Sequence, residues 1–113
     1  MILKIKSHFD AAHKLPNYQG KCSNLHGHRW EVILHLEFPS PNLSTGMCMD
    51  FGIVKEALGQ LLEKFDHQYL NDLMTNPTAE NIALELYKAC QFAFGSRFQK
   101  IEVWETPDCG VEV

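Results

Sequence analysis

The chain has 113 residues, of which 45% are hydrophobic and 21% charged, which is the balance of an ordinary globular protein and a length that suits one domain over residues 1–113. A formal net charge of −4 at pH 7 gives no overall attraction for nucleic acid, and no apolar run is long enough to cross a membrane. The first residues show no signal-peptide pattern and the four cysteines include no Cys-x-x-Cys pair, so we expect reduced thiols in a cytoplasmic protein.

The first third of the chain predicts two long strands separated by a loop. Residues 2–13 alternate apolar and polar side chains, which is typical of a strand with one buried face. Residues 14–25 are rich in glycine, proline and asparagine and indicate a loop. The alternation returns at residues 26–38. The expected apolar face of this second strand begins beside His28 and consists of Trp30, Val32, Leu34 and Leu36.

The middle of the chain predicts two helices. After a short extended piece at residues 47–49, Asp50 is the expected N-cap of a helix that ends near Phe65. The apolar residues at helical spacing in this segment are Ile53, Ala57, Leu58, Leu61, Leu62 and Phe65. A second helix begins after Thr78 and stops at Gly95. Its expected buried stripe consists of Ile82, Leu86, Ala89, Cys90 and Ala93.

Two further strands are expected at residues 100–106 and 110–113. The order strand-strand-helix-helix-strand-strand favours an α+β fold, in which an antiparallel four-stranded sheet carries two helices on one face. The two helical stripes cover only that face. Pairing of sheet edges between subunits would remove the exposed edges, so we expect a homo-oligomer.

Three histidines indicate a metal site. His26 and His28 are two residues apart on the second strand, so their side chains point to the same side, and His13 ends the neighbouring strand. Three imidazoles around one ion, with a fourth position open for water or substrate, form the pattern of a catalytic zinc site. Imidazole also suits copper, iron and nickel. Zinc (Zn2+) is the default for a lyase or hydrolase with three histidine ligands.

Cys22 lies one short loop before His26 and has three alternative roles. It is a reactive thiol beside the open metal position, if Lys21 or the metal lowers its pKa. It is a fourth ligand that closes a structural site, or it is an inert loop residue. Lys14, Lys21 and Arg29 form either a cationic patch for a small anionic substrate or ordinary solubilising charge.

Asp66, His67 and Glu105 each have an ordinary and a functional interpretation. Asp66 and His67 follow the first helix and are either its polar end or a catalytic pair. Glu105 continues the apolar face of the strand at residues 100–106. Either that strand emerges into solvent there, or the carboxylate accepts two parallel N–H donors of a planar ligand.

Six segments in order resemble the 6-pyruvoyltetrahydropterin synthase and 6-carboxytetrahydropterin synthase family, and the resemblance runs nearly from end to end. They are residues 9–13, residues 20–28, residues 49–51, residues 65–71, residues 77–81 and residues 104–106. In the fourth segment Phe65 stands where the family often has leucine, and we expect core packing to tolerate it.

The resemblance implies a tunnelling fold, in which sheets from several subunits join at their edges into barrels. Such proteins are commonly trimers paired into hexamers, with active sites at subunit interfaces. The resemblance also implies that His13, His26 and His28 bind zinc and that Cys22 is the general base.

The resemblance assigns the remaining site residues as follows. Asp66 and His67 form a proton relay that an adjacent subunit contributes. The resemblance implies that Glu105 anchors the pterin and that it can also take part in the relay. For the triphosphate of the substrate we assign Lys21 or a neighbouring basic residue.

The gap of three residues between Cys22 and His26 resembles the bacterial 6-carboxytetrahydropterin synthase branch of the family. The implied reaction converts 7,8-dihydroneopterin triphosphate and water to 6-carboxy-5,6,7,8-tetrahydropterin, acetaldehyde and triphosphate, a step of queuosine and 7-deazaguanine biosynthesis. The alternatives are a 6-pyruvoyl synthase, which eliminates triphosphate without losing two carbons, and a zinc-stabilised binding module without turnover.

Overall fold

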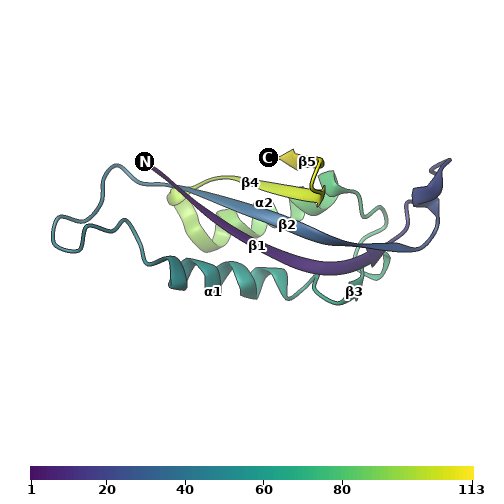
Figure 1. The fold of residues 1–113 in the computed structure, drawn as a ribbon, viewed down its shortest axis with the longest axis horizontal. Coiled ribbons are helices and arrows are strands. Elements are labelled where there is room, and N and C mark those ends of the chain that lie inside the picture. Colours follow the sequence, from purple (N-terminus) through teal and green to yellow (C-terminus); the bar gives the residue numbers. More distant parts are fainter.

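The computed structural model describes residues 1–113, which form a five-stranded sheet with two α-helices on one face (Figure 1). The strand order is β3-β1-β2-β4-β5, and all neighbours are antiparallel except β1 and β3. The elements are β1 (Ile2–His13), β2 (His26–Glu37), α1 (Phe51–Leu62), β3 (Gln68–Tyr69), α2 (Ala79–Phe94), β4 (Phe98–Thr106) and β5 (Cys109–Glu112), with 3₁₀ turns at Lys21–Ser23, Leu70–Asp72 and Gly95–Arg97. The predicted α+β class is confirmed.

The longest feature of the fold is the antiparallel pair β1 and β2, which runs in unbroken register from Ile2 opposite Glu37 to His13 opposite His26. The apolar residues of β2 face the helices, and the four predicted from the alternation are completely buried: Trp30, Val32, Leu34 and Leu36. Because this pair is continuous, it extends from the hydrophobic core to its far end, where His13 lies opposite His26.

Both helices begin at the predicted residues. The Asp50 carboxylate accepts the backbone N–H of Gly52 at 2.7 Å, and the Thr78 hydroxyl accepts that of Asn81 at 3.3 Å. Each cap satisfies a backbone donor that has no partner inside its helix. Gly95 ends α2 with a φ of 56°, a left-handed conformation that glycine adopts easily.

The buried stripe of each helix differs in part from the prediction. In α1 the row that faces the sheet is Val54, Leu58 and Leu62, whereas Ile53 is 63% exposed at the start of the neighbouring row. α1 ends at Leu62, and the chain then turns so that Phe65 fills the core at 2% exposure, which confirms that packing tolerates it. In α2, Ala93 is exposed because it lies in the last turn.

The sheet has five strands rather than the predicted four. The additional strand, β3, has two residues and pairs in parallel with Ala11 and Ala12 of β1. β4 begins at Phe98, two residues before the expected start. The last strand is also firmly held, because Val113 and Ile101 exchange two backbone hydrogen bonds of 2.9 and 3.0 Å.

The segment at residues 47–49 is a bend and not the extended piece that was predicted. Its loop closes on itself, because Asn42 donates its backbone N–H to the Met47 carbonyl at 2.9 Å and accepts that of Gly46 at 2.8 Å. The Met47 carbonyl is therefore used inside the loop and does not pair with a neighbouring strand.

The face of the sheet away from the helices is lined with ion pairs. Lys6 contacts Glu31 at 2.8 Å, and Lys100 contacts Glu112 at 2.6 Å. β3 covers only the last part of β1, so most of the outer edge of β1 has no strand partner. Neither α1 nor α2 is long and apolar enough to cross a membrane.

Candidate metal site

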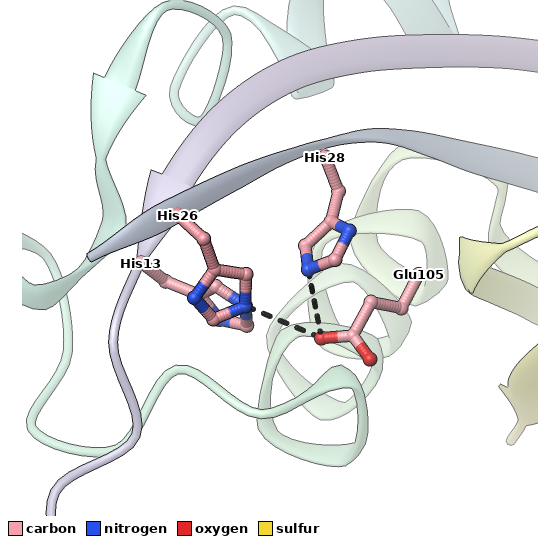
Figure 2. A group of neighbouring side chains, drawn as sticks. All are labelled: His13, His26, His28 and Glu105. Carbon is pink, nitrogen blue, oxygen red and sulfur yellow. Dashed lines mark hydrogen bonds and ion pairs between the residues drawn. The ribbon is translucent and has the colours of Figure 1, made fainter. Parts of the chain in front are cut away.

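The end of β1 and the start of β2 bring three histidines together (Figure 2). His13 and His26 are paired across the strands, and His28 lies two residues further along β2. The ring centroids are 4.5 Å apart for His13 and His26, 5.2 Å for His13 and His28, and 4.8 Å for His26 and His28. The three rings that strand alternation places on one side therefore lie next to one another.

Backbone carbonyl groups fix the orientation of the His13 and His26 rings. The Pro77 carbonyl accepts from His13 Nδ1 at 2.7 Å, and the Asn24 carbonyl accepts from His26 Nδ1 at 2.7 Å. A carbonyl oxygen can only accept, so in each neutral ring Nδ1 carries the proton and Nε2 presents a lone pair. The two Nε2 atoms are 3.0 Å apart. Two lone pairs at this distance repel each other unless a cation or a proton lies between them.

A carboxylate from β4 completes the cluster. One oxygen of Glu105, Oε1, lies 3.2 Å from His13 Nε2 and 3.5 Å from His28 Nε2, and the ligand atoms of all four residues lie within 4.8 Å of one another. Burial lowers the pKa of His28, and the nearby Glu105 carboxylate opposes that shift. A neutral imidazole is the form that binds metals.

The donor set suits a divalent metal ion. His28 Nε2 is buried and has no hydrogen-bond partner, which is rare for a polar atom in a protein interior. The second nitrogens of His13 and His26 are held by carbonyl groups, as is usual for histidines that bind metals. A cation shared by the Nε2 atoms would satisfy the orphaned nitrogen and relieve the repulsion.

Trp30 forms the floor of the cluster. Its ring is completely buried and meets His13 and His28 edge to face, with centroids 5.0 and 5.4 Å away. Its indole N–H donates to the Ala11 carbonyl at 3.4 Å. The histidine rings therefore rest on the hydrophobic core, which restricts their rotation.

Glu105 stands between two surface hollows. One, of about 690 Å³, is lined mainly by polar residues and includes His28. The other, of about 420 Å³, lies between the loop that follows β1, the start of α2 and β5. A small molecule entering either hollow can therefore reach the Glu105 side chain, which is 27% exposed.

Cys22 and Lys21 lie on the 3₁₀ turn of the loop between β1 and β2. Cys22 is half-buried, and its carbonyl accepts the Leu15 N–H at 2.8 Å, which ties the turn to the end of β1. Its thiol is not among the groups that converge, so the fourth donor beside the imidazoles is Glu105 rather than Cys22. Lys21 is exposed.

Asp66 and His67 form a separate pair at the outer edge of β1. His67 Nδ1 is 2.9 Å from Asp66 Oδ2, while Asp66 Oδ1 accepts the Asp10 N–H at 2.9 Å. His67 also donates its backbone N–H to the Asp10 carbonyl at 2.7 Å. These bonds hold His67 at a φ of 56°, which costs a side chain with a Cβ about 1–2 kcal/mol. The His67 side chain is 80% exposed.

Comparison with known proteins places this chain in a family. A family model described as 6-pyruvoyl tetrahydropterin synthase matches residues 2–113. The chain belongs to this family. It is 36% identical to the 6-carboxy-5,6,7,8-tetrahydropterin synthase of Rickettsia bellii, over 93% of this chain and 94% of that protein. It is 30% identical to the dihydroneopterin monophosphate aldolase of Pyrococcus furiosus, over 96% and 92% of the two chains.

The fold agrees with the family. The structure of Caenorhabditis elegans 6-pyruvoyl tetrahydropterin synthase superposes with a TM-score of 0.87, at 23% identity, covering 100% of this chain and 94% of that one. The tunnelling fold expected from the sequence is therefore confirmed for the single chain, with the histidine cluster at one end of its longest strand pair.

The structure also shows an ion pair near these sites that sequence reasoning missed. Arg29 makes a two-pronged ion pair with Asp10, with both N–O distances 2.9 Å, and holds the pKa of that carboxyl below its usual range. Of the three basic residues expected to form a cationic patch, Arg29 is thus paired with a carboxylate, whereas Lys14 and Lys21 are exposed. The strand register, which places Asp10 opposite Arg29, is the signal that could have found this pair.

Proposed function

We propose that this protein is a zinc-dependent lyase that converts 7,8-dihydroneopterin triphosphate and water to 6-carboxy-5,6,7,8-tetrahydropterin, acetaldehyde and triphosphate, in queuosine and 7-deazaguanine biosynthesis. The observation that carries the proposal is the convergence of three imidazole nitrogens, one of them buried without a partner, in a member of this pterin synthase family. The named activity of the Rickettsia bellii relative supports the choice of reaction.

In this proposal His13, His26 and His28 hold the metal ion. Zinc suits this site because it accepts three imidazoles and keeps a further position for substrate. A zinc ion at this site supplies Lewis acidity, which makes coordinated hydroxyl groups more acidic. The backbone carbonyls behind His13 and His26 keep both rings in the tautomer that ligation requires.

The other side chains move protons and bind the substrate. Cys22, as a thiolate, would remove a proton from a carbon of the substrate side chain, and His67, oriented by Asp66, would handle the second proton. The Asp66 hydrogen bond from the Asp10 backbone, followed by that from His67, lowers the pKa of Asp66 and keeps the carboxylate ionised. Glu105 accepts the N–H groups of the pterin, and Lys21 contacts the triphosphate.

We also propose that the active enzyme is a homo-oligomer, a trimer or hexamer, with sites at subunit interfaces. The outer edge of β1 lacks a partner along most of its length, and a long unpaired edge favours pairing with another strand. His67 projects from this edge and is 80% exposed, so it is placed to serve the site of an adjacent subunit. The four free cysteines suit the reducing cytoplasm.

The Pyrococcus furiosus relative favours a second candidate, an aldolase that acts on a dihydroneopterin phosphate. Both reactions break a carbon–carbon bond of the pterin side chain, and the same metal site and thiol would serve either one. The two differ in the aldehyde released, so products distinguish them.

The test is to incubate zinc-loaded protein with 7,8-dihydroneopterin triphosphate and to identify the pterin by mass and the aldehyde by derivatisation. The proposal predicts the 6-carboxy pterin with acetaldehyde in equal amounts. A 6-pyruvoyl pterin, or a hydroxymethyl pterin with a different aldehyde, would replace the proposed reaction with a related one. For Cys22→Ala we expect full zinc content and no turnover; loss of zinc and of folding would favour the binding module in which Cys22 is a ligand.

A further inference from the structure

We propose that Glu105 is a fourth metal ligand in the substrate-free protein and that it leaves the metal when a pterin binds. The inference rests on the proposed function, because it takes His13, His26 and His28 as the other ligands. It adds a second state of the site, which is closed at rest and opened by the substrate itself.

The distances around Glu105 suit a shared ion. Donors bound at about 2.0–2.1 Å to one tetrahedral zinc ion lie about 3.3 Å from one another. Glu105 Oε1 is 3.2 Å from His13 Nε2 and 3.5 Å from His28 Nε2, and the Nε2 atoms of His13 and His26 are 3.0 Å apart. Figure 2 shows the carboxylate turned toward the imidazoles, with one oxygen facing two rings.

A hydrogen bond does not explain this arrangement. His13 Nδ1 donates to the Pro77 carbonyl, so the neutral ring faces Glu105 with a lone pair, and a carboxylate oxygen also presents lone pairs. A proton on His28 Nε2 could join Glu105 to that ring, but the lone pairs of His13 Nε2 and Glu105 would still face each other at 3.2 Å. An ion at the centre of the cluster would satisfy both rings and the carboxylate at once.

The strand that carries Glu105 gives it room to move. β4 and β5 lose register at this point, since Trp104 pairs with Gly110 and Thr106 with Cys109, which leaves Glu105 without a partner on β5. Such bulges redirect a side chain and interrupt the hydrogen-bond ladder. The carboxylate also borders both hollows described above, so it can turn from the imidazoles toward a ligand in either one.

The two roles of Glu105 exclude each other in time. A carboxylate that accepts two parallel N–H donors of a planar ring uses both of its oxygens. When Glu105 binds the pterin in this way, it gives up the metal position, which the substrate hydroxyl then occupies. Recognition of the ring at one end of the substrate thereby frees the position at the reacting end.

Cobalt substitution tests the inference, because the visible absorption of Co²⁺ reports its ligands without any turnover. The proteins to compare are wild type, Glu105→Gln and Glu105→Ala, with Glu112→Gln as the matched control, since Glu112 is an exposed glutamate paired only with Lys100. We expect both Glu105 variants to change the Co²⁺ spectrum and to raise the metal Kd at least about tenfold, the size seen when a group that supports a ligand is lost. The control should match wild type.

Biopterin, which carries a hydroxylated side chain, tests the second half of the inference. Adding it to Co²⁺ wild type should move the spectrum away from the resting one, and the same addition to Glu105→Ala should shift the spectrum by less than half as much. Bound biopterin that leaves the wild-type spectrum unchanged would overturn the displacement.

The experiment distinguishes a failure of the Glu105 inference from a failure of the proposed function. If the Glu105 variants keep the wild-type spectrum and Kd while His28→Ala loses the metal, Glu105 is not a ligand and the proposed function stands. If folded wild type takes up neither Co²⁺ nor Zn²⁺, both proposals fall. Circular dichroism of each variant establishes that it is folded, and Glu105→Gln covers the case in which the alanine variant is not.

Discussion

The histidine cluster and the turn at Asp66 and His67 are built in opposite ways. The cluster is internal: His13 is completely buried, two rings are fixed by carbonyl groups, and Trp30 lies beneath them. The turn is external: His67 is 80% exposed and is held on the edge of β1 by backbone bonds to Asp10. This difference supports the proposal that the metal ligands all come from one chain, with the turn serving a site on another chain.

The largest effect should follow from breaking the cluster. We expect His28→Ala to lose bound zinc and all measurable turnover, because a metal site with two imidazoles no longer holds the ion against a chelator. His8→Ala is the matched control, since His8 is an exposed histidine on the same sheet, outside the cluster. Metal content by mass spectrometry after dialysis measures the outcome, and equal zinc in both variants would contradict the assignment.

The second-largest effect is a loss of turnover without a loss of zinc, which separates the turn at Asp66 and His67 from the histidine cluster. His67→Ala should retain zinc and stability but lose turnover by about 10²- to 10⁴-fold, the usual contribution of a positioned acid or base. If the turn acts on a neighbouring chain, mixed oligomers of His67→Ala and Cys22→Ala should regain activity, because some sites then combine two intact halves. Refolding the two inactive variants together measures this. Mixtures that stay inactive would place both residues in the site of one chain.

A smaller effect concerns the floor of the cluster. Trp30→Ala should lower the free energy of unfolding by about 3–5 kcal/mol, as large truncations in a core do. Because Trp30 also supports His13 and His28, the variant should bind zinc more weakly as well. Trp104→Ala, a truncation of a half-buried tryptophan, is the comparison and should cost less. Urea unfolding with and without zinc gives both quantities.

The smallest effect is at the external turn and depends on pH. The hydrogen bond from the Asp10 N–H, and then that from His67, lowers the pKa of Asp66 in the folded state. A lowered pKa means that the ionised carboxylate stabilises the fold above the unfolded pKa of about 4, and that this stabilisation is lost as pH falls through the folded value.

Asp66→Asn should therefore melt at a lower temperature than wild type at pH 7, and the difference should shrink as pH falls below the unfolded pKa of about 4. Asp72→Asn, in the exposed turn that follows, is the control and should show no such trend. A difference between wild type and Asp66→Asn that stays constant across this range would mean that the carboxylate charge does not matter for the turn.

Most of the fold could be predicted because its long elements repeat a pattern many times. The alternation of apolar and polar residues predicts β1 and β2, and the capping residues Asp50 and Thr78 predict where the helices begin. Both signals lie in the local sequence. β3 could not be predicted, since two residues carry no periodicity and their pairing depends on the backbone bonds between His67 and Asp10. In α1, Leu58 and Leu62 were predicted correctly, but Val54 rather than Ile53 begins the buried row, because both are apolar and only packing chooses between them.

The histidines of the site could be predicted from the sequence, whereas the position of Glu105 could not. The spacing of His26 and His28 on one strand predicts that their side chains lie on the same side of the sheet. The alternation of apolar and polar residues predicts the neighbouring strand that ends at His13. The position of Glu105 beside the imidazoles depends on where β4 loses register with β5, which no local pattern indicates. The role of the Asp10 backbone could not be read either, since a main-chain bond leaves no trace in residue type.

The left-handed backbone at His67 has a practical consequence for engineering a more heat-stable variant of this protein. Glycine or asparagine at position 67 would relax the turn, because both adopt that conformation more readily than histidine. Screening a library for heat tolerance alone should therefore enrich those two replacements and discard the imidazole. If His67 moves a proton as proposed, every round of selection must also score product formation.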